Sequence, residues 1–129
     1  MKTNKIAVGG RTSVNPEDVI ILKADINYTI IHFKNGQKCI VATPLKSLEQ
    51  QFEQYNFYRI HKSFMVNLAY VKTYFQTNNK VEMIDNQKAL VSRRKANGLK
   101  KYLLATDKSK TLPINQIRDY HKSIIIKFG

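Results

Sequence analysis

The sequence predicts a mainly β fold built from antiparallel hairpins, with one or two short helices. Short runs rich in β-branched and aromatic residues recur along the chain, and clusters of turn-forming residues separate them. One of these separations is Asn35-Gly36, among the strongest short hairpin signals. Apolar residues at helical spacing occur in two stretches, near residues 44–54 and after residue 92. The length of 129 residues suits one domain whose core needs no disulfide or metal.

The N-terminal part predicts two strands and then a hairpin. Residues 6–8 and 18–22 are β-branched runs, and the glycines, Ser13 and Asn15-Pro16 between them favour a turn. The segments on either side of the Asn-Gly pair are rich in β-formers. They predict a β-hairpin over residues 28–42.

A helix is predicted over about residues 44–54, because apolar residues recur there at intervals of three or four. Pro44 suits the first helical position, and Thr43 can act as its N-cap. The polar face of this helix mixes positive and negative charges. We therefore expect a solvated lid on the sheet rather than a binding element.

The second half predicts a β-meander followed by another helix. Strands are expected over residues 70–75, 80–84 and 88–91, with polar residues suited to turns between them. Ser92 can cap a helix that runs to about residue 104 with its leucines facing inward. The first turn of that helix would hold three cations, which the helix dipole disfavours unless a negative partner compensates.

Residues 105–129 are less periodic, and we expect them to be a C-terminal tail or extension beyond a domain that spans residues 1–104. Their last apolar run, at residues 124–128, could add an edge strand, pack on the domain or mediate self-association. The sequence shows no evident internal repeat and no linker long enough to separate two domains.

Charge is the strongest global signal in the sequence. The chain has 22 Lys+Arg against 9 Asp+Glu, a formal net charge of +13 and a pI near 9.9. The excess is uneven, since residues 1–55 carry 7 basic and 5 acidic side chains (net +2) while residues 56–129 carry 15 and 4 (net +11). Such an excess indicates an anionic partner that contacts mainly the second half, rather than a device for solubility alone.

Signatures of enzyme chemistry are missing. The sequence has no glycine-rich phosphate loop, no HExxH motif and no Cys/His spacing typical of zinc, and its carboxylates are few and scattered. Cys39 could pair with a histidine as a nucleophile, but it lies in a predicted apolar strand, where a buried structural cysteine is favoured. We therefore expect no catalytic activity, no metal and no cofactor.

The single cysteine excludes an intrachain disulfide and favours a reducing, cytoplasmic setting. The N-terminus lacks the apolar core of a signal peptide, and the longest late apolar run is far too short to span a bilayer. Neither export nor membrane insertion is expected.

Two basic elements share a composition and each lies at the mouth of a predicted strand or helix. They are residues 59–63 (Arg-Ile-His-Lys-Ser) and residues 92–95 (Ser-Arg-Arg-Lys). Arg and Lys can donate to guanine in the major groove, while Ser, Asn and backbone groups bind phosphates and fix register. On neighbouring loops the two elements could read a DNA duplex.

Other interpretations of the same residues are open. Each basic run could be an ordinary solvated surface. The charge could also serve an RNA-binding module, with Tyr55, Phe57, Tyr58 and Phe64 stacking on unpaired bases. A protein-interaction or membrane-surface module that uses charge alone is a third class.

Several motifs occur in a fixed order along the chain. They are Ala24-Asp25-Ile26-Asn27-Tyr28, Leu45-Lys46-Ser47-Leu48-Glu49, the set Arg59, His61, Ser63 and Val66-Asn67 before a Tyr70-Val71 strand, and Val91-Ser92-Arg93-Arg94 ahead of Leu99. Over about residues 5–104 this order resembles the LytTR DNA-binding domain of bacterial transcription regulators. Neither of the alternative classes requires these motifs in this order.

The resemblance implies an elongated, mostly antiparallel β fold that places loops in successive major grooves of double-stranded DNA, usually at paired direct repeats and with DNA bending. A homodimer on DNA is compatible with such repeats. Asn67 is expected to tie its loop to the backbone rather than to touch DNA. The implied base contacts are Asn27, Tyr28, Thr29, His61, Lys62 and Arg94, and the implied phosphate contacts are Arg59, Ser63, Ser92, Arg93 and Lys95.

Two features depart from the family pattern. Many family members follow a phosphoacceptor receiver domain, whereas this chain starts directly with the DNA-binding motifs, so we expect a stand-alone regulator. Its signal would then arrive through its abundance, through an upstream sensor or other partner protein, or through residues 105–129. Lys23 also stands where a glutamate is common in the family, which changes the charge of the first contact loop.

Overall fold

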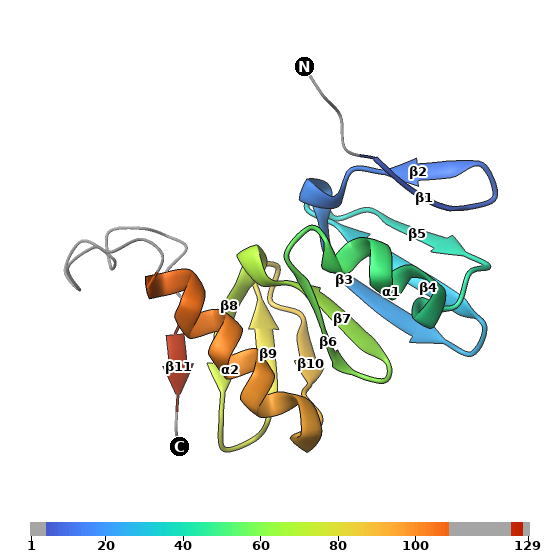
Figure 1. Ribbon diagram of the computed structural model, residues 1–129. Coiled ribbons are helices and arrows are strands. Elements are labelled where there is room, and N and C mark those ends of the chain that lie inside the picture. Colours follow the sequence, from blue (N-terminus) through green and yellow to red (C-terminus); the bar gives the residue numbers. More distant parts are fainter. Residues whose placement is uncertain (1–4, 109–124, 128–129) are drawn as a thin grey trace.

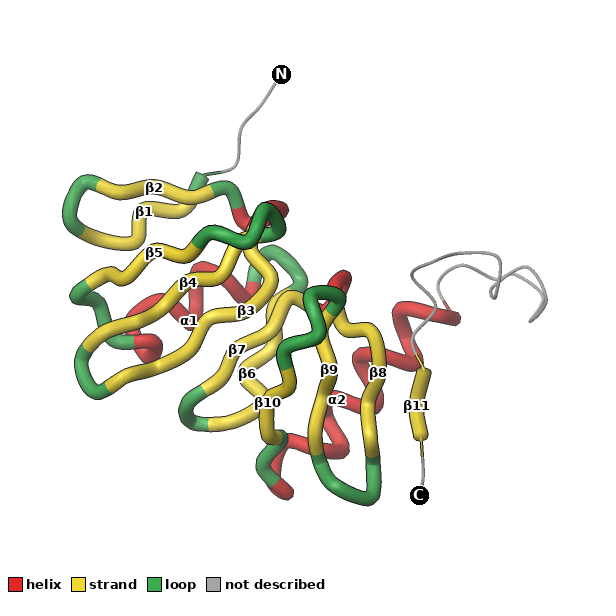
Figure 2. Tube along the Cα trace, turned by 180° about the vertical axis from the view of Figure 1, so that it is seen from behind, coloured by secondary structure: helices red, strands yellow, loops and turns green. Residues whose placement is uncertain are grey.

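The computed structural model describes residues 5–108 and 125–127, which fold into three β-sheets and two α-helices (Figure 1). The predicted mainly β fold is confirmed. The sheets follow one another in a row, and both helices lie on the same side of them (Figure 2). The helices are α1 (Leu45–Glu53) and α2 (Arg93–Lys108), and the smallest sheet pairs β1 (Ile6–Gly9) with β2 (Thr12–Val14).

The largest sheet has five antiparallel strands in the order β5-β4-β3-β7-β6. The hairpin predicted over residues 28–42 is its β4–β5 pair, joined through Gly36 at a φ of 89°. A second hairpin, β6–β7, pairs with β3 through β7. The strands are β3 (Val19–Asp25), β4 (Tyr28–Phe33), β5 (Lys38–Val41), β6 (Phe57–His61) and β7 (Phe64–Asn67).

Strand β3 is the centre of this sheet and is buried on both faces. Its first four residues are all buried, and a register shift between Val19 and Ile21 breaks the simple alternation of faces. Val19 and Leu22 contribute to the core beneath α1, while Ile20 and Ile21 contribute to the core shared with the next sheet. This explains why the sequence shows a continuous apolar run here rather than an alternating pattern.

The third sheet has the order β10-β9-β8-β11, with antiparallel pairs except for β11, which runs parallel to β8. Of the three roles considered for the last apolar run, the edge strand is the one observed, over residues 125–127. Helix α2 runs through residue 104, so the expected domain boundary falls inside a helix. The strands are β8 (Val71–Phe75), β9 (Lys80–Met83), β10 (Lys88–Leu90) and β11 (Ile125–Lys127).

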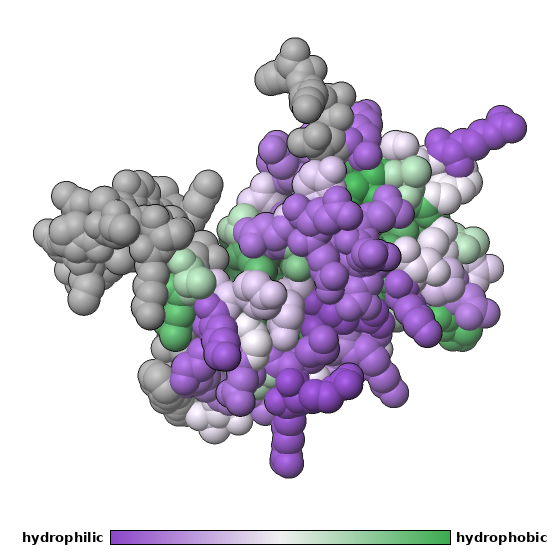
Figure 3. Space-filling view, in the orientation of Figure 1, coloured by the Kyte–Doolittle hydropathy of each residue, from purple (hydrophilic) through white to green (hydrophobic). Residues whose placement is uncertain are grey.

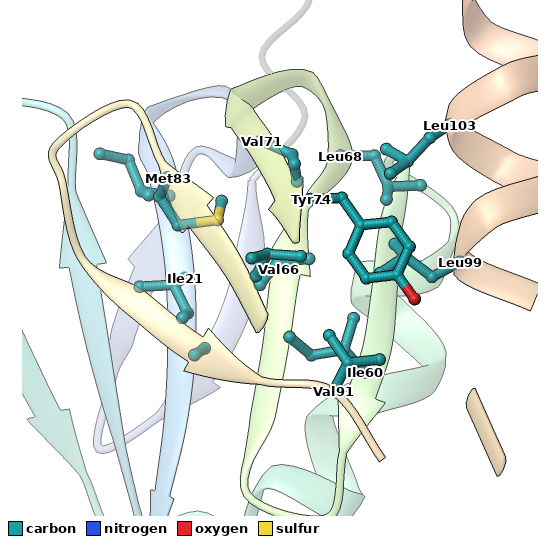
Figure 4. Close-up of a cluster of buried hydrophobic side chains, with 13 residues drawn as sticks. Ile21, Ile60, Val66, Leu68, Val71, Tyr74, Met83, Val91, Leu99 and Leu103 are labelled. Atoms are coloured by element: carbon teal, nitrogen blue, oxygen red, sulfur yellow. The ribbon is translucent and has the colours of Figure 1, made fainter. Parts of the chain in front are cut away.

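One apolar cluster joins the two larger sheets. Ile21, Ile60 and Val66 from the five-stranded sheet meet residues of β8 and β9, and α2 closes the cluster. Figure 4 shows Leu99 and Leu103 of α2 reaching toward the same cluster. Because the side chains of both sheets fill one core, the two sheets are held in a fixed relation to each other.

A structural repeat underlies the two larger sheets, although none was expected from the sequence. Each repeat begins with an Asn that caps a 3-10 turn and continues with three strands in a meander and a helix. Asn15 accepts the backbone N–H of Glu17, and Asn67 accepts that of Ala69. The first repeat is η1 (Pro16–Asp18), β3, β4, β5 and α1, and the second is η2 (Leu68–Tyr70), β8, β9, β10 and α2.

The turns between the second and third strands of the repeats share their hydrogen bonds. Gly36 N donates to Phe33 O at 3.0 Å, and Asn86 N donates to Met83 O at 2.8 Å. Gly36 and Asn86 both have a positive φ, which glycine and asparagine adopt at low cost. The further matching bonds are Lys34 N to Asp18 O with Ile84 N to Tyr70 O, and Gln37 N to Asn35 Oδ1 with Gln87 N to Asp85 Oδ1.

Neither of the two predicted N-cap hydrogen bonds forms in the structure. The cap position of α1 is Pro44 and has no side-chain cap bond, because the Thr43 hydroxyl instead donates to Val8 O at 2.7 Å. The hydroxyl of Ser92, which precedes α2, is buried and has no hydrogen-bond partner in the described part of the chain. The role of Asn67 is confirmed, since its amide also donates to Val19 O at 3.0 Å.

Candidate nucleic-acid interface

Three segments far apart in the sequence meet along one edge of the molecule, at the lower right of Figure 1. They are the β3–β4 turn, the β6–β7 turn and the start of α2. Ala24 N donates to Ser63 O at 2.8 Å, which joins the first two turns, and Ser92 N donates to Ile60 O at 2.8 Å, which joins the last two. Figure 2 shows the same succession from behind. We call this the tip edge.

The β6–β7 turn is held in shape by Arg59. Its guanidinium pairs with Glu49 of α1 at 2.6 Å and also donates to the carbonyls of His61 (3.0 Å) and Lys62. The Arg59 side chain is only 14% exposed. Ser63 N donates to His61 Nδ1 at 3.0 Å, which completes the turn. These bonds leave the exposed Lys62 projecting from a braced backbone.

Tyr58, next to Arg59 on β6, braces the start of α2. Its hydroxyl donates to Lys95 O at 3.4 Å, and the Lys95 ammonium lies 5.5 Å from the centre of its ring. Gly98 permits this approach, because a Cβ there would stand 2.2 Å from the Tyr58 oxygen. Burial raises the pKa of the Tyr58 hydroxyl, with Tyr102 and Glu53 adding to the shift, so Tyr58 remains a neutral donor.

The first turn of α2 carries its cations into solvent. Arg93 and Arg94 are exposed, and neither forms an ion pair with any described residue. No acidic residue lies in this turn. The structure therefore places cations near the positive end of the helix dipole, as the sequence predicted, and no carboxylate within the turn offsets their charge.

The two basic elements line a common hollow of about 270 Å³. On one side are His61 and Lys62, and on the other are Arg94 and Lys95. Lys46 of α1 adds a further cation at the rim. Figure 3 shows hydrophilic side chains gathered over the centre and lower part of this side of the molecule. The Glu49 carboxylate also lines the hollow but is paired with Arg59, so the hollow offers an anion several donors from three separate elements.

The β3–β4 turn supplies the uncharged part of the tip edge. Asp25 pairs with Tyr28, so Ile26 and Asn27 alone form the turn. Asn27 is exposed, and Tyr28 is 50% exposed. Thr29, in contrast, is fully buried, and its hydroxyl donates to Thr43 O at 2.6 Å.

The comparison with protein families decides the identity. The model of the LytTr DNA-binding domain matches residues 9–104. The chain belongs to the LytTR family. No curated protein sequence matches it. A solved structure described as the LytTr DNA-binding domain of a methyl-accepting/DNA response regulator from Bacillus cereus is similar in fold, with a TM-score of 0.63 and 21% identity, and the match covers 80% of this chain and 98% of that one.

Membership in the LytTR family makes the chain a DNA-binding domain of a transcription regulator, with DNA as its partner. Within the described residues no helix is long and apolar enough to cross a membrane. The same part of the chain holds no group of three or more His, Cys, Asp or Glu side chains arranged for a metal ion.

Three of the expected contact residues have side chains that are buried or hydrogen-bonded within the protein. Thr29 is buried and its hydroxyl is already bonded, so it has no surface to offer a base. Arg59 uses three of its five N–H donors within the protein, and its side chain is only 14% exposed, so it offers little surface to a phosphate. The Ser92 hydroxyl is buried, so it cannot reach a phosphate in this arrangement.

The other expected contact residues lie on the tip edge with exposed or half-buried side chains: Asn27, Tyr28, His61, Lys62, Ser63, Arg93, Arg94 and Lys95. Sequence reasoning missed Lys46, because the mixed charges of its helix indicated a solvated lid. It also passed over Ile26, which directly precedes the chosen Asn27. Only the topology, which starts α1 beside the β6–β7 turn, brings Lys46 to the hollow.

Proposed function

We propose that this LytTR domain recognises specific double-stranded DNA by inserting the turns of the tip edge into successive major grooves, at direct repeats. One observation carries the proposal: His61 and Lys62 share a hollow with Arg94 and Lys95, about thirty residues away in sequence. A row of loops on one edge suits a ligand that is long and uniformly anionic.

The roles divide by chemistry. Lys62 and Arg94 would donate to guanine, and Asn27, Tyr28 and His61 would complete the contacts with base edges. Ser63, Arg93, Lys95 and Lys46 would hold phosphates, and the anionic backbone would supply the negative partner that the first turn of α2 lacks. Arg59 and Tyr58 would position these groups without touching DNA. No step of this function needs a catalytic residue, a metal or a cofactor.

The biological setting is part of the same proposal. Two copies would occupy paired repeats, as a homodimer or as independent domains. The signal would come from abundance or from a partner protein such as an upstream sensor. The regulator would act in the cytoplasm, where bacterial DNA lies.

Three of the four rings considered for stacking on RNA are engaged within the protein. Phe57 is buried, and its ring lies edge-on against that of Phe52 at 5.0 Å. Tyr58 packs against Tyr102 at 5.0 Å, and Phe64 packs against His61 at 5.4 Å. Rings engaged in this way are poorly placed to stack on unpaired bases.

Selection from a random duplex library followed by anisotropy titration tests the proposal. Arg94→Ala should cost about 1–3 kcal/mol on the selected site and relax base preference at one position. Arg93→Ala should weaken all duplexes to a similar extent and reduce the salt slope by about one unit. Lys101→Ala, an exposed cation further along α2, is the control. Equal binding of the wild type to selected and random duplexes would refute specific recognition.

A further inference from the structure

Ile26 is the most exposed large apolar side chain among the described residues. It is 88% exposed and stands at the tip of the β3–β4 hairpin. Isolated apolar residues on a surface are common and need no explanation by themselves. Ile26 differs from the others in its backbone.

The φ of Ile26 is +57°, in the left-handed region, where a β-branched residue is strained. The second repeat places Asn79, at a φ of 50°, in its corresponding β8–β9 turn. Asparagine adopts this conformation at low cost. Asn56 and Asn86 are further positive-φ asparagines of this chain. The β3–β4 turn therefore keeps a costly residue in a backbone conformation that asparagine adopts at three other places in the described chain; Arg11 is the further non-glycine residue with a positive φ.

The position of the turn places Ile26 on the tip edge. The bond from Ala24 N to Ser63 O holds the β3–β4 turn beside the β6–β7 turn, from which Lys62 projects. Asn27 and Tyr28 follow Ile26 directly. Along the chain, the apolar side chain of Ile26 thus directly precedes the polar side chains that are proposed to contact the bases.

We propose that Ile26 is a specificity-determining residue that packs on the 5-methyl group of a thymine in the major groove. The inference rests on the proposed function. The thymine methyl is the apolar group that a base pair presents in that groove, and it marks T·A against the other pairs. Contact between the two removes apolar surface of both from water, which stabilises the complex. A contact with the thymine methyl in the complex thereby explains why a strained isoleucine is exposed in the free protein.

A deoxyuridine scan of the selected duplex tests this contact, because it removes one methyl group at a time and leaves base pairing intact. For the wild type, one substitution should weaken binding about fourfold, the effect of losing one buried methyl group. Ile26→Ala should bind the thymine duplex about fourfold or more weakly and show no further loss at that uridine. Ile84→Ala is the matched control, since Ile84 is 47% exposed in the β9–β10 turn at the other end of the sheets.

Ile26→Gly provides a second variant in which the turn is relaxed. It should raise the melting temperature while binding as weakly as Ile26→Ala, which excludes misfolding as the cause. If Ile26→Ala remains as sensitive as the wild type to every uridine, the thymine contact is refuted while specific recognition stands. If the wild type selects no duplex, the proposed function itself fails.

Discussion

The two structural repeats use one arrangement of elements for different chemistry. Residues 15–53 carry four Lys+Arg against five Asp+Glu, a net charge of −1, whereas residues 67–108 carry nine against three, a net charge of +6. The first repeat brings a tight hairpin turn with exposed Ile26, Asn27 and Tyr28 to the tip edge. The second brings the cationic start of α2. The shared frame sets where groups are presented, and local sequence sets what is presented.

The β6–β7 hairpin connects the repeats and braces each of them with one side chain. Arg59 reaches α1 through Glu49, and its neighbour Tyr58 reaches the start of α2 through Lys95. Variants that break one brace at a time should therefore show which repeat depends more on this hairpin.

Arg59→Met should have the largest effect, a loss of about 2–4 kcal/mol of stability together with weaker DNA binding. It leaves the partly buried Glu49 unpaired and frees the carbonyls of His61 and Lys62. Chemical denaturation and anisotropy titration measure the two quantities. Combining it with Glu49→Met should restore much of the stability but not the affinity, because the turn stays unbraced. Loss of affinity with unchanged stability would instead favour a direct phosphate contact by Arg59.

Asn15 and Asn67 cap the 3-10 turns of the two repeats, so substitutions of these asparagines compare the repeats at equivalent positions. Asn67→Ala should cost about 2–3 kcal/mol, because the buried amide caps η2 and also donates to Val19 O across the sheet. Asn15→Ala should cost only about 0.5–1 kcal/mol, because its side chain makes the cap bond with Glu17 N at an exposed site. Denaturation midpoints measure both. Equal losses would show that the cap alone, not the link between repeats, determines the cost.

Gly98→Ala probes the contact of Tyr58 with α2. Helix propensity alone would stabilise the variant by about 1 kcal/mol. The added Cβ would meet the Tyr58 oxygen, so we expect a net loss of about 1 kcal/mol instead. Asn97→Ala, at an exposed neighbouring position, should show only the favourable propensity effect. Thermal melting distinguishes the two, and a stabilised Gly98→Ala would mean that the ring moves away freely.

The smallest effect concerns the pH dependence of stability through His32 on β4. Burial, then Lys23 and Lys38, lowers the pKa of His32, whereas Asp85 of the second repeat opposes the shift. A lowered pKa in the folded state means that the unfolded chain binds the proton more readily. The stability is therefore present above pH 6.5 and is lost as the pH falls through the folded pKa.

Melting temperatures between pH 7.5 and 5 measure this dependence. His32→Gln should flatten it. Asp85→Asn keeps an oxygen for the Gln87 N–H and should steepen the dependence slightly, because the charge that favours protonation is removed. An unchanged slope in both variants would place the titrating group elsewhere.

Local signals in the sequence were enough for most strands and for the Asn35-Gly36 hairpin. They failed where a side chain bonds across a long stretch of sequence. Thr43 looks like a helix cap in its local context, but its hydroxyl bonds Val8, 35 residues away. Strand β2 has only three residues, Thr12–Val14, and was absorbed into the turn expected between the first two strands. The repeat was hidden because the core residues of the two sheets differ, and only the turn chemistry is shared.

The candidate site was predictable in its segments but not in the availability of each side chain. The sequence of β4 does not tell that Thr29 faces the core, because isoleucines stand on both faces of the strand, although only Thr29 and Ile31 are buried. A run such as residues 59–63 shows cations without showing which one pairs with Glu49. The family resemblance pointed to the loops that lie on the tip edge. The structure then distinguishes donors that face outward from donors that are hydrogen-bonded within the protein and hold the loops in shape.

Strand β11 has a consequence for the colloidal behaviour of the protein. By pairing along β8, it satisfies the backbone donors and acceptors of an edge that would otherwise be available to a strand from another molecule. A proline in place of Ile126 would remove one backbone donor from this strand. The fold should survive, since β8, β9 and β10 still pair with one another, but concentrated solutions should form aggregates by edge-to-edge pairing of β8.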